Sequence, residues 1–514
     1  MADARRDAAH GERNMIDRVP IRHLSSGVPG LDEVLGGGVP EFSLNLIAGG
    51  PGCGKTTLGH QIMFANASPE RRAVYFTVIG EPPIKMLRYQ QQYTFFDATK
   101  VGDGSVRFIH LGKQALDGGM AKVLEAIVQE IEASNPGIVV VDSFRSMVRG
   151  ALASGPTGER ELTDFMQRLA LALTGYEATS FLIGEYAEGE HDSAVFTVAD
   201  GLIWLYQAVE RNSVVRKVQV MKSRGQAQIP GLHTARITDA GYSVFPRLLK
   251  PMEVLIERPL EVRLSTGVEG LDEMMGGGIP RGYSALIAGP SGSGKTVLSN
   301  QFILEGATRG EHGIVAIFEK RPNDYLQTTP HGEDFEKLVR QKKLEVLYLR
   351  PLDLSIDETL LEIQNAVKRL GAKRAVIDSL SGLELALAPT FREDFRESLY
   401  RMMGALTGLG VTVMATVELA DSYNDLRFSP QGIAFLTDAI IMQRYVEIDG
   451  QLKRAMAVVK VRSSQHSKDL REYEISSDGE VIVGQALKGY EGLLTGRPSG
   501  GERGKGGRKR RRTR

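Results

Sequence analysis

Two short segments of this sequence have the residue types and the spacing of a phosphate-binding loop. Residues 49–56 (GGPGCGKT) and 289–296 (GPSGSGKT) both match G-x-x-x-x-G-K-[ST], and each follows an apolar run and opens a helix-like stretch. In such a loop, glycines let successive N–H groups turn towards the phosphates, and the helix N-terminus adds the positive end of its dipole. The pattern predicts two nucleotide sites, and a glycine-rich turn that binds nothing is the weaker alternative.

The residues expected to contact nucleotide and metal come mainly from these loops. In the first segment they are Gly49, Gly52, Cys53, Gly54, Lys55, Thr56 and Thr57, and in the second they are Gly289, Ser291, Gly292, Ser293, Gly294, Lys295, Thr296 and Val297. The lysines are expected to reach the β- and γ-phosphates. The hydroxyls of Thr56 and Thr296 are the expected Mg²⁺ ligands, because Mg²⁺ is a hard cation that prefers oxygen.

An aspartate at the end of an apolar strand is the second component of such a site. Asp142 ends the run IVVVD, and Asp378 ends the run AVID. An acidic residue there organises metal and water beside the phosphates. An aspartate that caps a following helix has the same local pattern, so each one alone is a weak signal. Because one follows each loop at a similar distance, we predict catalytic roles for both.

Cys53 is the only cysteine in the chain. Its position at a helix N-terminus predicts a lowered thiol pKa, and oxidation could then prevent ATP binding. A small residue that merely fits the loop is the simpler interpretation. A single cysteine excludes a disulfide within the chain and fits a reducing compartment.

The elements around the loops recur at a domain-sized period. Lys55 and Lys295 are 295 − 55 = 240 residues apart, within longer passages that both contain G-L-D-E and a run of three glycines. Apolar runs such as SLNLIAG, RAVYFTV and GIVVVDS alternate with helix-like stretches, and the second half repeats this order. The pattern predicts an α/β fold in which each half is a mainly parallel sheet with helices on both faces.

Composition gives the expected domains and environment. We predict a flexible leader at 1–17, two nucleotide-binding domains at 18–248 and 249–492, and a disordered basic tail at 493–514. Lys plus Arg and Asp plus Glu both number 63, so no overall charge attracts nucleic acid or a membrane. No apolar run is long enough to cross a bilayer, and a cytoplasmic location is expected.

With these motifs located, the sequence resembles the KaiC family of RecA-like ATPases over residues 18–489. The resemblance implies a homohexamer, ATP and Mg²⁺ bound between neighbouring subunits, slow ATP hydrolysis and regulatory protein partners. In many members it also implies autophosphorylation on the second domain. It further implies basic residues that reach the ATP of a neighbouring subunit, and the matching positions are Lys222, Ser223 and Arg224, and Lys460, Val461 and Arg462. A solvated basic edge strand is the alternative for these positions.

The resemblance also implies two adjacent glutamates after the strand that follows the second loop. Glu319 occupies the first position, where it is expected to act in catalysis and beside the metal, but Lys320 occupies the second. In the first domain Ile79 and Gly80 stand at these positions, and Glu81 follows one residue late. We therefore expect hydrolysis in the first domain to be weak or to depend on Glu81.

The family's phosphoacceptor positions carry Ala434 and Phe435, neither of which has a hydroxyl, although Ser429 and Thr437 lie nearby. Autophosphorylation of the usual kind is therefore not expected. The favoured function is a ring-forming ATPase in signalling or clock-like regulation. Three alternatives stay open: a Ser/Thr autokinase with another acceptor, a low-turnover nucleotide-dependent scaffold, and a DNA motor that only the basic tail supports.

Overall fold

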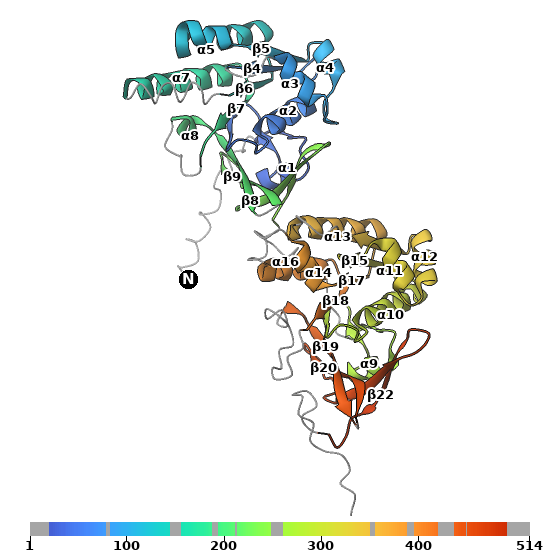
Figure 1. Cartoon of the computed structure of the whole chain (residues 1–514). Coiled ribbons are helices and arrows are strands. Elements are labelled where there is room, and N and C mark those ends of the chain that lie inside the picture. Colours follow the sequence, from blue (N-terminus) through green and yellow to red (C-terminus); the bar gives the residue numbers. More distant parts are fainter. Residues whose placement is uncertain are drawn as a thin grey trace, which may run out of the picture. The chain divides into compact units, whose positions relative to one another are not determined.

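The computed structural model describes residues 20–78, 83–143, 156–187, 194–210, 213–247, 261–349, 355–387, 395–419, 436–448 and 450–490 (Figure 1). The chain divides into two compact units. One comprises Met1–Gln207 and Arg216–Arg247, and the other comprises Ala208–Val215 and Leu248–Arg514. No helix in the described part of the chain has the length and apolar character that a membrane crossing requires.

The first unit contains a nine-stranded sheet in the order β11-β10-β9-β8-β3-β7-β6-β4-β5. Strands β3 to β8 include the parallel pairs, and β10 pairs antiparallel with both β9 and β11. The strands are β3 (Leu44–Gly49), β4 (Ala73–Thr77), β5 (Val106–His110), β6 (Ile138–Asp142), β7 (Thr179–Glu185), β8 (Gly201–Glu210), β9 (Ser213–Ser223), β10 (His233–Thr238) and β11 (Gly241–Phe245). A separate short ribbon pairs β1 (His23–Leu24) with β2 (Val39–Pro40).

Helices cover both faces of this sheet. One face packs against α2, where Leu58 and Ile62 contact the core formed by Val140 and Ile183. The other face packs against α5 and α7. The helices in the described part of the unit are α1 (Leu31–Leu35), α2 (Lys55–Asn66), α3 (Pro83–Gln90), α4 (Ala98–Gly102), α5 (Gly112–Ser134), α7 (Pro156–Gly175) and α8 (Ala194–Val198). The central strands are apolar on both sides because each side is covered, which is the reason for their uninterrupted apolar runs.

The second unit repeats the same sheet order as β16-β15-β17-β18-β14-β19-β20-β21-β22. Its central pairs are parallel, and the ladder from β19 to β22 is antiparallel. The strands are β14 (Ser284–Gly289), β15 (Gly313–Ile317), β16 (Leu344–Tyr348), β17 (Arg374–Asp378), β18 (Thr412–Glu418), β19 (Ala439–Ile448), β20 (Gln451–Val461), β21 (Arg471–Ile475) and β22 (Val481–Ala486), with β12 (Arg263–Leu264) and β13 (Ile279–Pro280) as a separate pair.

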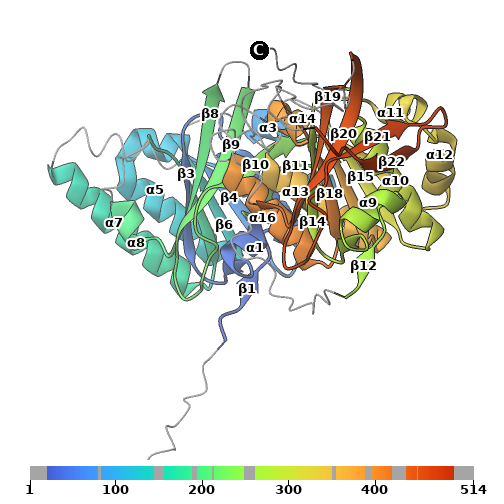
Figure 2. The same ribbon diagram turned by 90° about the horizontal axis from the view of Figure 1, so that it is seen from below.

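The helices of the second unit also lie on two faces. Figures 1 and 2 show α13, α14 and α16 on one side of the sheet and α9, α10 and α12 on the other, and each set encloses its own apolar core. Their bounds are α9 (Glu269–Met274), α10 (Lys295–Thr308), α11 (Pro322–Thr328), α12 (Gly332–Arg340), α13 (Ile356–Leu370), α14 (Leu380–Ala386) and α16 (Phe395–Gly408).

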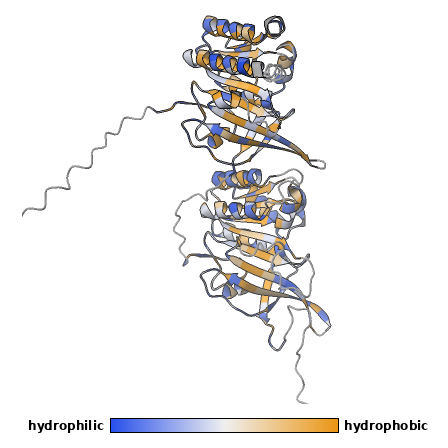
Figure 3. Cartoon of the chain, turned by 90° about the vertical axis from the view of Figure 1, so that its left-hand side faces the viewer, coloured by the Kyte–Doolittle hydropathy of each residue, from blue (hydrophilic) through white to orange (hydrophobic). Residues whose placement is uncertain are grey.

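The predicted α/β fold with two tandem, mainly parallel sheets is confirmed. In Figure 3 the strands of each unit are mostly hydrophobic, whereas the helices outside them mix hydrophilic and hydrophobic residues. This distribution is the one expected for a sheet that is buried between two helical layers.

Candidate active sites

Each phosphate-binding loop joins a central strand to the helix behind it. Strand β3 ends at Gly49 and α2 begins at Lys55, while β14 ends at Gly289 and α10 begins at Lys295. Both helices are preceded by a glycine with left-handed backbone geometry, at φ 93° for Gly54 and 94° for Gly294. A side chain at either position would be strained and would collide with Ile237 or Ile475. Glycine is therefore required at the sharp turn into each helix.

The loop lysines fold back over their own loops. Lys55 Nζ donates to the carbonyl oxygen of Gly50 at 2.6 Å, and Lys295 Nζ donates to those of Gly289 and Pro290 at 2.9 and 2.8 Å. Burial lowers the pKa of both lysines, and nearby carboxylates offset part of the effect. Each ammonium group is thus held at the loop by hydrogen bonds that a phosphate oxygen could replace.

The predicted hydroxyl and carboxylate for a metal are adjacent in both units. Thr56 Oγ1 donates to Asp142 Oδ2 at 2.8 Å, and Thr296 Oγ1 donates to Asp378 Oδ2 at 2.8 Å. Both aspartates end a strand two places from the loop strand in the sheet order. Burial raises the pKa of Asp142, and the hydrogen bonds from Tyr75 and Thr56 oppose that change. These oxygen donors match the ligand preference of Mg²⁺.

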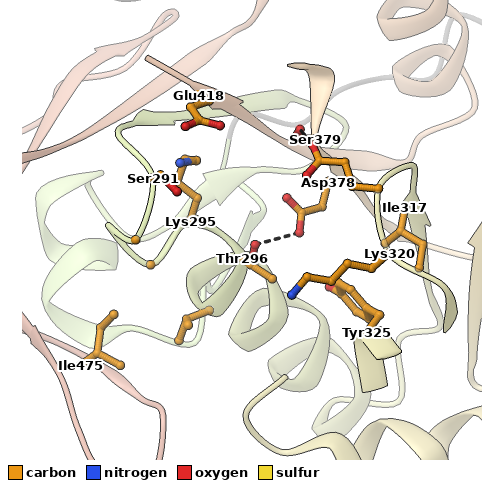
Figure 4. Close-up of a pocket in the computed structure, with 14 residues that line it drawn as sticks. Ser291, Lys295, Thr296, Ile317, Lys320, Tyr325, Asp378, Ser379, Glu418 and Ile475 are labelled. Atoms are coloured by element: carbon orange, nitrogen blue, oxygen red, sulfur yellow. Dashed lines mark hydrogen bonds between the residues drawn. The ribbon is translucent and has the colours of Figure 1, made fainter. Parts of the chain in front are cut away.

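A cavity in the second unit gathers most of the residues predicted for that site. Its lining includes Ser291, Gly292, Gly294, Lys295, Thr296, Val297, Glu319 and Asp378. Glu319 accepts a hydrogen bond of 2.9 Å from Ser379 Oγ, which orients its carboxylate. Lys320 also lines this cavity and donates to Thr328 Oγ1 at 3.1 Å. Figure 4 shows Thr296 hydrogen-bonded to Asp378 within this group.

The corresponding cavity in the first unit is lined by Gly52, Gly54, Lys55, Thr56, Thr57, Asp142 and Ser143, and also by Tyr93, Glu185, Arg216 and Ile237. Glu81, predicted as the displaced carboxylate, lies outside the described residues, as do Ile79 and Gly80. Among the described residues that line this cavity, the carboxylates are Asp142 and Glu185.

Two glutamates were missed by the sequence argument. Glu185 ends β7 and is paired with Gly49, and Glu418 ends β18 and is paired with Gly289. Both line the cavities, and both are close enough to raise the pKa of the loop lysine in their unit. Figure 4 shows Glu418 beside Lys295. The sequence did contain a pattern that could have found them. TSFLIGE and TVMATVE are apolar strands that end in an acidic residue, as do the strands that end in Asp142 and Asp378.

Four predicted loop residues lie behind the loops and do not line the cavities: Gly49, Cys53, Gly289 and Ser293 are all buried. The predicted lowering of the Cys53 pKa is wrong. Burial raises the pKa of this thiol, and the opposing effects of Lys55 and of a backbone hydrogen bond are smaller. A buried thiol with a raised pKa is a poor target for oxidation, so the structure favours the simpler role of filling space.

Ser293 occupies the place of Cys53 in the second loop and is held by polar contacts. Its hydroxyl donates to Gln443 Oε1 at 3.0 Å, and its carbonyl oxygen accepts the Tyr473 hydroxyl at 2.6 Å. The second loop is therefore fixed by hydrogen bonds to β19 and β21, whereas Cys53 of the first loop belongs to an apolar core.

The two basic segments lie at or just beyond the ends of β9 and β20. Lys222 and Ser223 end β9 and Arg224 follows, while Lys460 and Val461 end β20 and Arg462 follows. None of these residues belongs to the lining of the cavity in its own unit.

Within the chain, the basic side chains have local partners. Arg224 pairs with Asp200 at 3.0 Å, and Arg462 pairs with Asp438 at 3.1 Å. Lys222 Nζ donates to the carbonyl oxygen of Ala199 at 2.6 Å. The carbonyl oxygen of Thr437 accepts a hydrogen bond of 2.6 Å from Lys460 Nζ. The two arginine side chains are more than half exposed, so their ion pairs contribute little stability.

The phosphoacceptor region lies largely outside the described residues, since Ser429, Ala434 and Phe435 are not among them. Thr437 is described and is fully buried. Its hydroxyl is therefore not presented to solvent.

Comparisons with known proteins agree with the geometry. A family model described as the KaiC ATPase matches residues 24–248 and again residues 264–487. The circadian clock oscillator protein KaiC of Picosynechococcus sp. is 29% identical over 488 residues, which cover 93% of this chain and 93% of that protein. The protein of that name from Synechococcus elongatus is 27% identical over 495 residues, covering 95% and 93%. The circadian clock protein KaiC3 of Synechocystis sp. is 27% identical over 498 residues, covering 93% and 95%.

Proposed function

Because this chain belongs to the KaiC family of ATPases, we propose that both of its units bind ATP with Mg²⁺ and that it works as a ring-forming regulatory ATPase. One observation carries this proposal: in each unit a loop lysine, a threonine hydroxyl and a half-buried aspartate converge at the mouth of the loop. A lysine and N–H groups suit phosphate oxygens, and the hydroxyl–carboxylate pair suits Mg²⁺.

The side chains at the two sites are of the chemical types that bind a nucleotide with Mg²⁺. We propose that Thr56 with Asp142, and Thr296 with Asp378, hold the metal at the two sites. When bound, Mg²⁺ would neutralise charge that develops on the phosphates during hydrolysis. The loop lysines bind the β- and γ-phosphates, and they exchange their carbonyl partners for phosphate oxygens as they do so.

In the second unit, Glu319 is the proposed general base and is also proposed to lie beside the metal. Its hydrogen bond from Ser379 holds the carboxylate in the cavity, where it can orient a water molecule and accept its proton. Glu418 lies beside Lys295 and is a second acidic group at this site. Lys320 cannot serve as a base while protonated, so its proposed contribution is to bind anionic oxygen atoms.

In the first unit, Glu185 is the proposed water-orienting carboxylate. The position equivalent to Glu319 carries Ile79, which cannot accept a proton. Glu185 lines the cavity from the strand next to the loop strand. A base that approaches from a different strand makes slower hydrolysis the expected result, because proton transfer depends on close alignment with the attacking water. Glu81 is the alternative base for this site.

We propose a homohexamer in which Arg224 and Arg462 contact the nucleotide of a neighbouring copy. To do so, each arginine leaves the aspartate with which it pairs within the chain. Lys222 and Lys460 are proposed to contact the same nucleotides. Cations supplied in this way stabilise charge on the γ-phosphate and make hydrolysis depend on assembly. Ring assembly also provides surfaces for regulatory protein partners. Autophosphorylation is not part of the proposal, because the expected acceptor positions carry Ala434 and Phe435.

The test compares ATP turnover in Lys55→Ala and Lys295→Ala proteins, measured separately with phosphate incorporation into protein. We expect Lys295→Ala to remove most of the turnover and Lys55→Ala to remove the smaller remainder, with each substitution weakening nucleotide binding at its own site. Unchanged turnover and binding in both variants would contradict the proposed function. Binding without turnover would favour the scaffold, and stoichiometric phosphoprotein would favour the autokinase.

A further inference from the structure

The half-buried aspartates of the two cavities each receive a second hydrogen bond, and the donors come from opposite neighbouring strands. In the first unit Tyr75 of β4 donates its phenol hydrogen to Asp142 Oδ2 at 2.6 Å. In the second unit Thr416 of β18 donates its hydroxyl hydrogen to Asp378 Oδ1 at 2.5 Å. In both sites a neighbouring strand thus supplies a hydroxyl that fixes the orientation of the carboxylate.

The strand registers show that each unit lacks the donor used by the other. Tyr75 is the third residue of β4, and the third residue of the equivalent β15 is Val315. On the neighbouring strand β7, the residue paired with Asp142 is Ile183. In the second unit Ile377 is paired with Ala415, so Thr416 takes the position that Ile183 has in the first.

Tyr75 is held rigidly enough to act as a fixed donor. It is fully buried, and its ring stacks on His60 of α2 with a centroid separation of 4.4 Å. Phe108 of β5 packs at 5.5 Å from it. The phenol has few alternative orientations in this position, so its hydroxyl fixes the direction of the carboxylate.

Thr56 donates to the same oxygen, Asp142 Oδ2. When the Thr56 hydroxyl turns to a metal ion, Tyr75 is the one of these two donors that keeps its bond to Asp142. The phenol is therefore most important when the site is loaded.

We propose that Tyr75 is the positioning residue that holds Asp142 for Mg²⁺ in the first site, as Thr416 holds Asp378 in the second. This inference rests on the proposed function of the site. In the first unit the aspartate is held by a tyrosine and in the second by a threonine, although the two phosphate-binding loops match.

The test measures Mn²⁺ affinity by electron paramagnetic resonance, with a non-hydrolysable ATP analogue, in Lys295→Ala protein so that only the first site is loaded. Tyr75→Phe removes the hydroxyl and keeps the ring packing. We expect it to weaken Mn²⁺ binding about tenfold, the lower end of the range for groups that orient a metal ligand. Analogue binding without metal is expected to stay unchanged.

The matched rescue combines Ile183→Thr with Tyr75→Phe. The new threonine places the hydroxyl donor of the second unit in the first unit, and the double variant should recover at least half of the lost Mn²⁺ affinity. Thr416→Val in Lys55→Ala protein should weaken Mn²⁺ binding at the second site in the same way. An unchanged Mn²⁺ affinity in Tyr75→Phe overturns the inference, and so does an equal loss of metal-free analogue binding. A failed rescue overturns the equivalence of the two hydroxyls.

The outcomes also separate this inference from the proposed function. If Lys295→Ala protein binds neither Mn²⁺ nor the analogue at its first site, the proposed function of that site fails. If it binds both and Tyr75→Phe binds them equally well, only the role of Tyr75 fails.

Discussion

We predict that His60 makes the first unit sensitive to acid. This histidine lies on α2, is fully buried, and packs against both Tyr75 and Phe108. Burial lowers its pKa from 6.5 to about 3, and a contact with Gln90 offsets only part of the shift. The folded unit therefore keeps the imidazole neutral at pH values where the unfolded chain protonates it.

The sign and the size of the effect follow from these two pKa values. The stabilising contribution is complete well above pH 6.5 and is lost as the pH falls through 6.5 towards 3, because only the unfolded state binds the proton in that window. At pH 5 the loss is about 2 kcal/mol, and near pH 7 it is only about 0.2 kcal/mol. Such a loss is a large share of the stability of an ordinary domain.

Trp204 provides the assay, because it is the only tryptophan in the sequence and is buried on β8 of the first unit. Urea unfolding followed by its fluorescence at pH 7.5, 6 and 5 should report the stability of this unit. His60→Leu keeps a similar volume without a titrating group, so its stability should fall by about 2 kcal/mol less between pH 7.5 and 5 than that of the natural chain.

His23→Gln replaces an exposed histidine and is the matched control, with the pH dependence of the natural chain expected. If His60→Leu and the natural chain lose stability equally on acidification, the neutral buried histidine is not the cause of the acid sensitivity. The same result would show that His60 is protonated without unfolding the unit.

Three further predictions concern catalysis, assembly and stability. Glu319→Gln should lower ATP turnover at the second site about hundredfold with unchanged ATP affinity, and Glu185→Gln should have this effect only at the first site. Turnover is measured in proteins that keep only one intact loop lysine. If either variant hydrolyses ATP as fast as the same protein with the glutamate, that carboxylate has no role in catalysis. Arg462→Ala should slow hydrolysis in assembled protein without changing the unfolding midpoint, and unchanged turnover would leave the arginine only its pairing within the chain. Arg374→Met should destabilise the second unit by about 1.5–3 kcal/mol, the usual contribution of hydrogen bonds to a charged group. Arg374 is fully buried and donates to Glu311 at 2.7 Å and to two backbone carbonyl oxygens. Circular dichroism melting checks this, and an unchanged transition would show that these contacts contribute no net stability.

The fold was predictable because its signals are local. Uninterrupted apolar runs alternate with helix-like segments, and this pattern alone indicates parallel strands covered on both faces. The loops and the strand-end aspartates are also local patterns. The structure then places Thr56 against Asp142 and Thr296 against Asp378, which lie 86 and 82 residues apart in sequence.

Contacts that depend on strand order were not predictable in this way. Glu185 and Glu418 face the loop lysines because β7 and β18 lie next to the loop strands, and the chain order of the strands does not reveal that neighbour relation. Tyr75 looked like an ordinary core residue of an apolar strand, and only the register brings its hydroxyl to Asp142.

The two units differ in the layer between the sheet and the loop helix, while their strand order and loop geometry agree. Strand order, the left-handed glycine and the lysine–threonine–aspartate arrangement are the same in both. Within that layer, His60 of the first unit is replaced by Asn300, whose side-chain oxygen accepts a 2.6 Å hydrogen bond from Tyr325. The first aspartate is supported through an aromatic stack that includes a buried titratable ring, whereas the second is supported by a threonine. Because closely packed side chains transmit the displacement of one member to its neighbours, a substitution of His60 should disturb the Asp142 site, whereas the equivalent substitution of Asn300 should leave the threonine support of Asp378 in place.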